Sequence, residues 1–300
     1  MKLYFYRAKK PNFGDELNLT MWNHLLPPGF FDGQEDELFL GIGSILFDTH
    51  PKEPRKIVAG SGWGYSNAAD VHDGSWDVLF VRGPRTADAL GLDRSLSVGD
   101  AAILLRETPL PEAKPNVGTA FMPHFDSLER GNWSEVCRLA GITYIDPTGD
   151  VDDILSTIRG ADLVIAEAMH GAIVSDALRT PWIAMRPIAD IHRMKWHDWA
   201  EALSIPLRQF DLSPSNLREA WSAISGMDAR GRRSRMMMDG PLGAPANWVI
   251  KQRAARQLQK LAQEEPQLSE DAVIEGATSR ALEALDAFLR KRSLPIAAGG

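Results

Sequence analysis

Short apolar runs alternate with segments of helical spacing along most of this chain. In the first hundred residues, the apolar runs predict buried strands at 2–7, 37–40, 56–59 and 77–81. Apolar positions with helical spacing predict helices at 17–25 and 85–90, and Pro84 suits the first position of the second helix. Strands that alternate with helices are typical of right-handed crossover units, so this half is expected to contain a parallel sheet.

A second alternating series follows the proline-rich segment 107–115, which we interpret as an interdomain linker. Its predicted strands are 116–122, 143–145, 163–166 and 182–185, and its predicted helices are 133–140, 151–158, 172–178, 195–203 and 214–224. Beyond Gly226, two alanine-rich helices are predicted at 246–264 and 277–290. The sequence therefore predicts an α/β fold with an N-terminal domain at 1–107, a second domain at 116–225 and a helical tail at 226–300.

The segment 163–178 predicts a strand, a tight turn and a helix that Pro181 terminates. This turn puts Glu167 and His170 at the carboxyl edge of a parallel sheet, beside a helix N-terminus, where doubly wound proteins bind anions. His170, followed by Gly171, can act as a general acid or base or hydrogen-bond a phosphate, or it can simply cap the turn. Glu167 can orient the imidazole and keep it protonated, or it can be a partly buried surface carboxylate.

Two arginines flank Pro84 at the start of the predicted helix 85–90. Arg82 ends a buried strand and is expected to point to the same kind of sheet edge as His170. Paired N–H donors at such a place suit a phosphate or a carboxylate. Arg85 lies on a helix face, where a solvated side chain is the simpler interpretation.

Other candidate residues lie in loops after the first strands. Asp15 and Glu16 follow a loop glycine and can activate a hydroxyl group, although Asp15 can also merely cap the next helix. Gly43 and Gly62 belong to glycine-rich turns that allow the backbone to approach a ligand closely.

Composition narrows the class of protein. The 300 residues carry a formal net charge of −7, which argues against a dedicated nucleic-acid binder. The single cysteine, Cys137, cannot form an internal disulfide, and the N-terminus does not resemble a secretory leader, so we expect a cytoplasmic protein. The sequence contains no apolar run of about 18 residues, so any membrane contact is expected to be peripheral, at the inner face of the plasma membrane.

No metal or nucleotide cofactor is expected. The glycines Gly41 and Gly43 lack the third glycine of a dinucleotide fingerprint, and no phosphate-loop motif is present. A basic cluster spans residues 230–235 and can touch a polyanionic or lipid-diphosphate partner, although a solvated basic loop is the simpler interpretation. Four potential metal ligands have a spacing that fits no defined pattern: Asp190, His192, His197 and Asp198.

Several of these motifs occur in an order that resembles the polysaccharide pyruvyltransferase family, most closely its branch from exopolysaccharide (succinoglycan-type) biosynthesis. The resemblance covers about residues 2–203. It is carried by the segments Asn12-Phe-Gly-Asp-Glu16, Gly41-Ile-Gly-Ser44, Val81-Arg-Gly-Pro-Arg85, Val98-Gly-Asp100, Met169-His170-Gly171 with Pro181, and Lys195-Trp196.

The resemblance implies two Rossmann-like halves in a GT-B-like arrangement, with the acceptor bound by the first half and the donor by the second. It implies transfer of a pyruvyl group from phosphoenolpyruvate, as co-substrate, to a sugar of a lipid-linked or other saccharide acceptor, which forms a ketal. By this resemblance, His170 is the catalytic acid/base, Arg82 and Lys195 bind the donor, and Asp15 faces the acceptor. Many members carry an arginine where this chain has Ala168, so a donor contact is expected from elsewhere, with Arg186 and Arg193 as candidates.

Two other functions remain open from the sequence. One is a glycosyltransferase that uses a nucleotide-sugar donor, because the two-domain architecture does not fix the reaction. The other is an inactive polysaccharide-assembly protein, in which the alanine at position 168 reflects lost activity.

Overall fold

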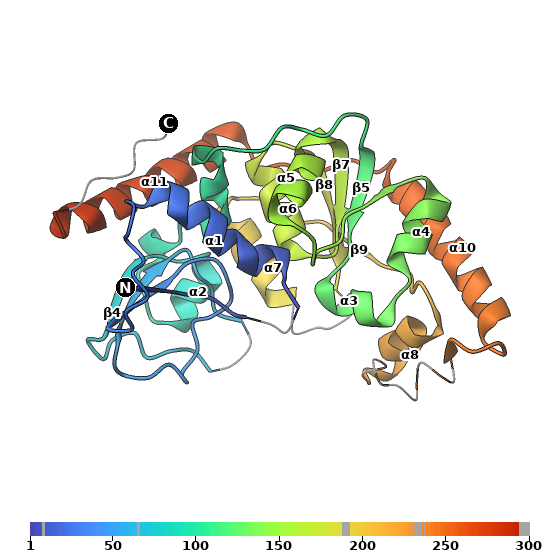
Figure 1. Ribbon diagram of the computed structural model, residues 1–300, viewed down its shortest axis with the longest axis horizontal. Coiled ribbons are helices and arrows are strands. Elements are labelled where there is room, and N and C mark those ends of the chain that lie inside the picture. The colour runs from blue at the N-terminus through green and yellow to red at the C-terminus, as the bar shows by residue number, and fades with distance from the viewer. Residues whose placement is uncertain are drawn as a thin grey trace.

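The computed structural model describes residues 1–7, 10–64, 67–187, 193–227, 229, 231, 234, 236 and 238–293. Two α/β halves lie side by side, and two long helices occupy opposite ends of the molecule (Figure 1). Some residues of the predicted metal set and basic cluster lie outside the described residues: Asp190, His192, Arg230, Arg232, Arg233 and Arg235.

The N-terminal half contains a four-stranded parallel sheet in the order β1-β2-β3-β4. The strands are β1 (Lys2–Tyr4), β2 (Glu37–Leu40), β3 (Arg55–Ala59) and β4 (Trp76–Phe80). The helical elements are α1 (Phe13–Leu25), α2 (Pro84–Ala89), and the 3₁₀ helices η1 (Arg94–Leu96) and η2 (Ala101–Glu107). All four predicted strands and both predicted helices of this half are confirmed, and Pro84 begins α2 as expected.

The C-terminal half contains a five-stranded parallel sheet in the order β6-β5-β7-β8-β9. The strands are β5 (Gly118–Met122), β6 (Thr143–Tyr144), β7 (Ala161–Ala166), β8 (Trp182–Arg186) and β9 (Gln209–Asp211). The helices are α3 (Phe125–Arg130), α4 (Trp133–Ala140), α5 (Val151–Gly160), α6 (Met169–Ala177), α7 (Arg193–Ala202) and α8 (Leu217–Ser225). Only α3 and β9 were not predicted, because both are too short to show a periodic apolar pattern.

The predicted α/β architecture of two Rossmann-like, GT-B-like halves is therefore confirmed. The central strand β7 shows why the apolar runs were informative. Four of its residues, 163–166, are buried in a row, as expected for a parallel strand covered on both faces. The described residues 108–117 lead from η2 to β5 without a helix or strand.

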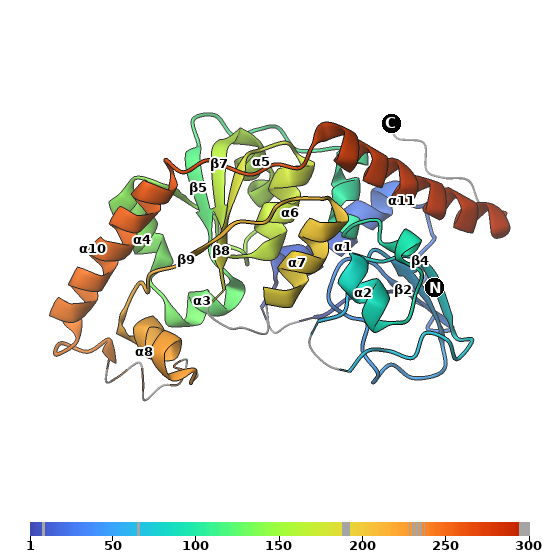
Figure 2. The same ribbon diagram turned by 180° about the vertical axis from the view of Figure 1, so that it is seen from behind.

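The two predicted C-terminal helices, α10 (Ala244–Leu261) and α11 (Asp271–Lys291), pack on different halves (Figures 1 and 2). Helix α10 lies against α4 at the far end of the C-terminal half. Helix α11 returns to the N-terminal half, where it contacts η2 and β4 and where Arg292 pairs with Glu37. The tail is thus divided between the two halves. Within the described residues, no helix is both long enough and apolar enough to cross a membrane.

One buried apolar cluster runs through both halves. It includes Leu17 of α1, Ile103 of η2, Ile173 of α6 and Trp199 of α7. Helix η2 contacts α1, α6 and α11 and so sits at the boundary between the halves. Because the two halves share this core, the boundary fixes the position of the residues that line the cleft between them.

Candidate functional site

A cavity of about 490 Å³ lies between the two halves, where the carboxyl ends of both sheets face each other. Its walls come from the segments that follow β1, β2, β5 and β7, together with α1 and α7. The residues that line it are Tyr6, Asn12, Asp15, Gly43, Ser44, Ile45, Phe47, Thr49, His124, Phe125, Met169, His170 and Lys195. Four predicted site residues thus meet in one place: His170, Asp15, Gly43 and Lys195.

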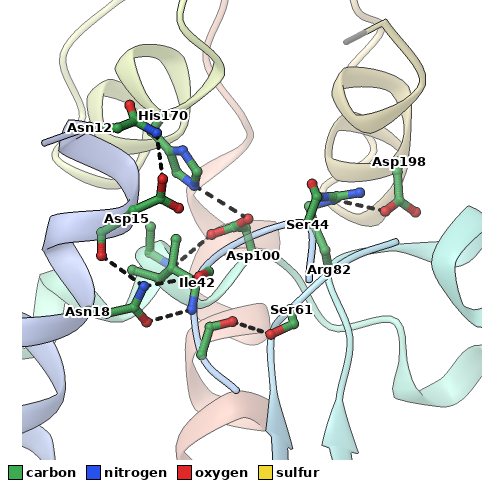
Figure 3. A network of polar contacts seen from close by, with 12 residues as sticks. Asn12, Asp15, Asn18, Ile42, Ser44, Ser61, Arg82, Asp100, His170 and Asp198 are labelled. Carbon is green, nitrogen blue, oxygen red and sulfur yellow. Dashed lines mark hydrogen bonds and ion pairs between the residues drawn. The ribbon is translucent and has the colours of Figure 1, made fainter. Parts of the chain in front are cut away.

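His170 lies in the first turn of α6, directly after β7 and the turn at 167–168. One side of its ring packs against Gly14 of α1, where any added side chain would overlap the imidazole. On the other side, Nε2 lies 3.8 Å from Oδ2 of Asp100, and 15 % of the histidine side chain is exposed (Figure 3). The ring is therefore held between Gly14 of α1 and Asp100, which comes directly before η2.

Asp100 is fully buried and precedes η2. Its Oδ1 accepts a hydrogen bond of 3.0 Å from the backbone N–H of Ala102 and so caps that helix. Among the described residues, neither Oδ2 of Asp100 nor Nε2 of His170 has a hydrogen-bond partner, and these two buried atoms face each other. Burial raises the pKa of Asp100 to about 6.

The imidazole of His170 is neutral at physiological pH in this site. Burial, followed by the positive charges of Lys195 and Arg82, lowers its pKa to about 3. A neutral imidazole has one N–H donor and one acceptor nitrogen. With Nε2 facing a carboxylate, the favoured tautomer carries its proton on Nε2, which leaves Nδ1 as the acceptor.

Asp15 lies in the first turn of α1 with its side chain toward the cavity. Its Oδ2 accepts a hydrogen bond of 2.8 Å from the side-chain amide of Asn12, which occupies the N-cap position. Asp15 therefore does not serve as the cap of this helix. Burial raises its pKa to about 6, although Asn12 and Lys195 counteract this shift.

Asn18 holds the start of α1 against the glycine turn that follows β2. Its Nδ2 donates to the carbonyls of Asp15 and Ile42, each at 3.0 Å, and its Oδ1 accepts from the N–H of Ile42 at 2.8 Å. The same Oδ1 accepts from the indole of Trp22 at 3.1 Å. This buried network places Asp15 beside Gly43, whose φ of 137° is strained for any residue with a side chain.

Glu167 does not orient His170, which corrects that expectation. It is buried, and its two oxygens accept hydrogen bonds from the N–H of His124 at 2.8 Å and from Oγ of Ser127 at 3.0 Å. Burial, reinforced by the nearby Glu219, raises its pKa to about 7. Glu167 thus fixes the start of α3, and the carboxylate beside the imidazole is Asp100.

Arg82 lies behind the cavity wall. It is fully buried, and its Nε donates to Oδ2 of Asp198 at 2.9 Å, its Nη1 to Oγ of Ser44 at 2.7 Å and its Nη2 to the carbonyl of Trp63 at 2.6 Å. Gly62 packs directly against the guanidinium, where a side chain would overlap it. Arg82 therefore positions the lining residue Ser44 and contributes positive potential to the site at His170.

The remaining predicted site residues do not line the cavity. Arg85 forms an ion pair of 2.6 Å with Glu201 on α7 and is partly exposed. Gly171 packs against Met122 and Ala166 beneath α6. Glu16 is half-buried on α1.

Lys195 of α7 lines the cavity and also a recess of about 30 Å³ that adjoins it. Ala168 lines the same recess, so the position where the resemblance led us to expect an arginine lies beside Lys195. Of the candidate replacements, Arg186 pairs with Asp211 at 2.6 Å, and Arg193 begins α7 outside the cavity lining. Among the described residues that line this wall, Lys195 supplies the positive charge.

Asp198, one of the four potential metal ligands, has a structural role. Asp198 accepts hydrogen bonds from Arg82 and from the backbone and hydroxyl of Thr86, and so joins α7 to the start of α2. Within the described part of the chain, no group of three or more His, Cys, Asp and Glu side chains is arranged to hold a metal ion.

Sequence reasoning missed several residues that build the site, namely Asn12, Asn18, Ser44, Asp100 and His124. Asn12, Ser44 and Asp100 belong to motifs that drew attention, but polar residues in a loop do not show which of them will face a cavity. Asn18 had a signal, because a polar residue on the apolar face of a predicted helix calls for buried partners.

Comparison with known proteins decides the family. A family model described as polysaccharide pyruvyl transferase matches residues 39–187. The chain is also 33 % identical to the succinoglycan biosynthesis protein ExoV of Rhizobium meliloti (strain 1021), over 97 % of this chain and 99 % of that protein. The chain belongs to the polysaccharide pyruvyl transferase family. In this member of the family, both sheets contribute to the cavity, and the matched residues include Arg82, Asp100 and His170.

Proposed function

We propose that this protein transfers a pyruvyl group from phosphoenolpyruvate to two hydroxyl groups of one sugar in an exopolysaccharide precursor, which forms a ketal. The observation that carries the proposal is the meeting of His170, Asp15 and Lys195 in one cavity of a pyruvyl transferase family member. The relative ExoV is named as a succinoglycan biosynthesis protein, which supports an exopolysaccharide acceptor.

The donor carries close to three negative charges, and the wall formed by α6 and α7 is suited to it. Helix α6 begins at this wall, and the first turn of a helix offers N–H groups that have no partner within the helix. Lys195 adds a cation from α7. The recess beside Ala168 gives the phosphate room next to that lysine.

His170 serves as the acid in the proposed reaction. A bound phosphate offsets the positive potential of Lys195 and Arg82, which is part of what keeps the ring neutral. Donor binding therefore raises the pKa of the ring, and the imidazole takes up the proton that it then gives to the methylene carbon of the donor. Asp100 faces Nε2 and stabilises the imidazolium, as a buried carboxylate does for a catalytic histidine.

Asp15 serves as the base. With a pKa of about 6, it is ionised at neutral pH and accepts the proton of the first sugar hydroxyl as that oxygen attacks the neighbouring donor carbon. The carbon–oxygen bond to phosphate then breaks, and the second hydroxyl closes the ketal as its proton leaves with the phosphate. The products are the pyruvylated sugar and inorganic phosphate.

The test supplies the purified protein with a lipid-linked oligosaccharide and either labelled phosphoenolpyruvate or labelled nucleotide sugars. We expect label to reach the acceptor from phosphoenolpyruvate alone, and phosphoenolpyruvate to raise the melting temperature without any acceptor. Transfer from a nucleotide sugar only, with no thermal effect of phosphoenolpyruvate, would establish a glycosyltransferase instead. If neither transfer nor binding is observed, the result would favour an inactive assembly protein.

A further inference from the structure

Large apolar side chains are exposed to solvent at one end of the molecule. Seven of the ten exposed large apolar side chains among the described residues lie between residues 221 and 249. We name six of them the apolar tip: Trp221, Ile224, Met227, Leu242, Trp248 and Val249. Their exposed fractions range from 48 % at Trp221 to 98 % at Leu242.

The apolar tip is a local feature of the fold. Helix α8 and the first turns of α10 lie together at the outer end of the C-terminal half (Figures 1 and 2). Hydrogen bonds tie them to one another, because Asn247 of α10 accepts from the N–H of Leu217 at 2.8 Å and donates to the carbonyl of Met238 at 2.8 Å. The apolar side chains are thus carried by segments that hydrogen bonds hold together.

Helix α10 has one buried face and one exposed face. One face is buried against α4 and carries Ala254 and Leu258. The solvent face carries Trp248 and Val249 in the first turns, followed by the exposed Arg253 and Arg256. The helix contains four basic residues and no acidic residue, in a protein whose formal net charge is −7.

The sequence between the two helices is also basic. Residues 228–235 include four arginines and one aspartate. Trp and aliphatic side chains combined with Arg and Lys are the composition of surfaces that lie in the headgroup region of an anionic bilayer, where the indoles insert at the interface and the cations meet lipid phosphates. A second copy of this acidic chain would not supply that negative surface as uniformly.

We propose that the apolar tip and the basic face of α10 dock this protein onto an anionic phospholipid bilayer. The surface lies one helix away from the cavity. Helix α8 is joined to α3 by hydrogen bonds from Arg218 to the carbonyl of Glu129 at 2.5 Å and from Asn216 to the carbonyl of Arg130 at 2.6 Å. Phe125, the first residue of α3, lines the cavity. Docking at the tip therefore holds the cavity close to the bilayer surface, where a lipid-linked acceptor would be presented.

The experiment is co-sedimentation of the full chain with vesicles, which needs no turnover and so is independent of the proposed reaction. We expect binding to vesicles of phosphatidylcholine with phosphatidylglycerol, weakened by salt, and little binding to phosphatidylcholine alone. Two double variants, Trp221→Ser with Trp248→Ser and Arg253→Glu with Arg256→Glu, are each expected to weaken binding roughly tenfold or more. All four side chains are exposed or partly exposed, so the melting temperature is expected to stay within a few degrees of wild type.

Matched controls change the same kinds of side chain elsewhere. Leu19→Ser removes an exposed apolar side chain on α1, and Arg280→Glu reverses an exposed charge on α11. Both controls are expected to bind vesicles like wild type. The proposal is overturned if wild type does not bind anionic vesicles, or if the controls and the tip variants bind these vesicles equally well. It is also overturned if sedimentation velocity shows a wild-type dimer that the tip variants lose, because a second copy would then cover this surface.

Discussion

Asp100 and His170 face each other across the boundary between the two halves, with Oδ2 and Nε2 3.8 Å apart. Asp100 precedes η2 of the N-terminal half, and His170 lies in the first turn of α6 of the C-terminal half. The catalytic histidine of the proposed reaction is thus oriented by the opposite half of the molecule. The N-terminal half also supplies Arg82, whose charge helps to lower the pKa of the ring, so the relative position of the two halves affects the protonation state of His170.

The first prediction concerns Asp100→Asn. The variant keeps Oδ1 as the acceptor for Ala102 but replaces the carboxylate that faces Nε2 by a neutral amide. We expect kcat to fall about 10- to 100-fold, as for other losses of a group that orients a reactive one, with KM for phosphoenolpyruvate nearly unchanged. Steady-state kinetics would check this split. Asp93→Asn is the control, because Asp93 caps η1 in the same manner outside the site, and a fall in kcat of similar size there would contradict the role of Asp100.

The second prediction concerns His170→Asn. Loss of a general acid is expected to lower the rate of pyruvyl transfer about 100- to 10,000-fold while phosphoenolpyruvate still raises the melting temperature. The rate can be followed as released phosphate. His72→Asn serves as the control, because His72 lies outside the cavity and bonds the carbonyl of Leu90. Full activity of the His170 variant would remove the histidine from the mechanism.

The third prediction concerns pH and stability. The pKa of His170 is about 3 in the folded protein, below the ordinary value of 6.5, so the unfolded state binds more protons between these values. The stabilising contribution of the neutral ring is therefore complete above pH 6.5 and is lost as the pH falls toward 3. Relative to His170→Asn, wild type should have a lower free energy of unfolding at about pH 5 than at about pH 7.5. Urea denaturation of both proteins at the two pH values measures this difference. Parallel pH curves for the two proteins would show that the ring is not buried in neutral form.

The fourth prediction concerns Gly14→Ala. The added methyl group would overlap the imidazole of His170, so the ring cannot keep its present position between Gly14 and Asp100. We expect a loss of activity of at least about tenfold, because misplacing a reactive group is costly even without removing it. Gly276→Ala, in the exposed middle of α11 with open space around it, is expected to keep full activity and to gain up to about 1 kcal/mol in stability. Equal activities of the two variants would contradict the packing of Gly14 on the ring.

The fifth prediction concerns the buried ion pair of Arg82 and Asp198. Removing one partner, as in Arg82→Met, leaves a buried carboxylate unpaired and is expected to cost about 3–5 kcal/mol in the free energy of unfolding. The double variant Arg82→Met with Asp198→Leu is expected to recover part of that loss, since no charge is then left buried. Urea denaturation of the single and double variants measures both effects. A double variant less stable than the single one would show that the hydrogen bonds from Thr86 to Asp198 outweigh the cost of the unpaired buried carboxylate.

The sequence predicted local structure well where the pattern is long enough. The apolar run of β7, followed by the turn at 167–168 and the helix that ends before Pro181, located His170 at a helix start, and the structure agrees. A parallel strand that is buried on both faces leaves a continuous apolar run, and in a strand–helix–strand crossover unit a helix follows it. The position of the candidate site was therefore accessible from the sequence.

The partners across the cleft were not accessible from the sequence. Glu167 is near His170 in sequence but points to His124 and Ser127, whereas Asp100 is distant in sequence and faces the ring. Arg82 was expected at the same sheet edge as His170 and, by resemblance, as a donor-binding residue, but Asp198 on α7 holds its buried guanidinium behind the cavity wall. Such pairings depend on how two halves dock, and no periodic pattern within one segment encodes that docking.

The return of α11 to the N-terminal half has a consequence for the synthesis of the chain. Leu285, Phe288 and Leu289 of this helix belong to the same buried cluster as Phe39 of β2, and the Phe288 ring lies 6.4 Å from that of Phe30. Domains generally fold as units in the order in which they leave the ribosome. Here the half that is translated first lacks part of its core until the last helix has emerged. The N-terminal half therefore cannot complete its core before α11 is available.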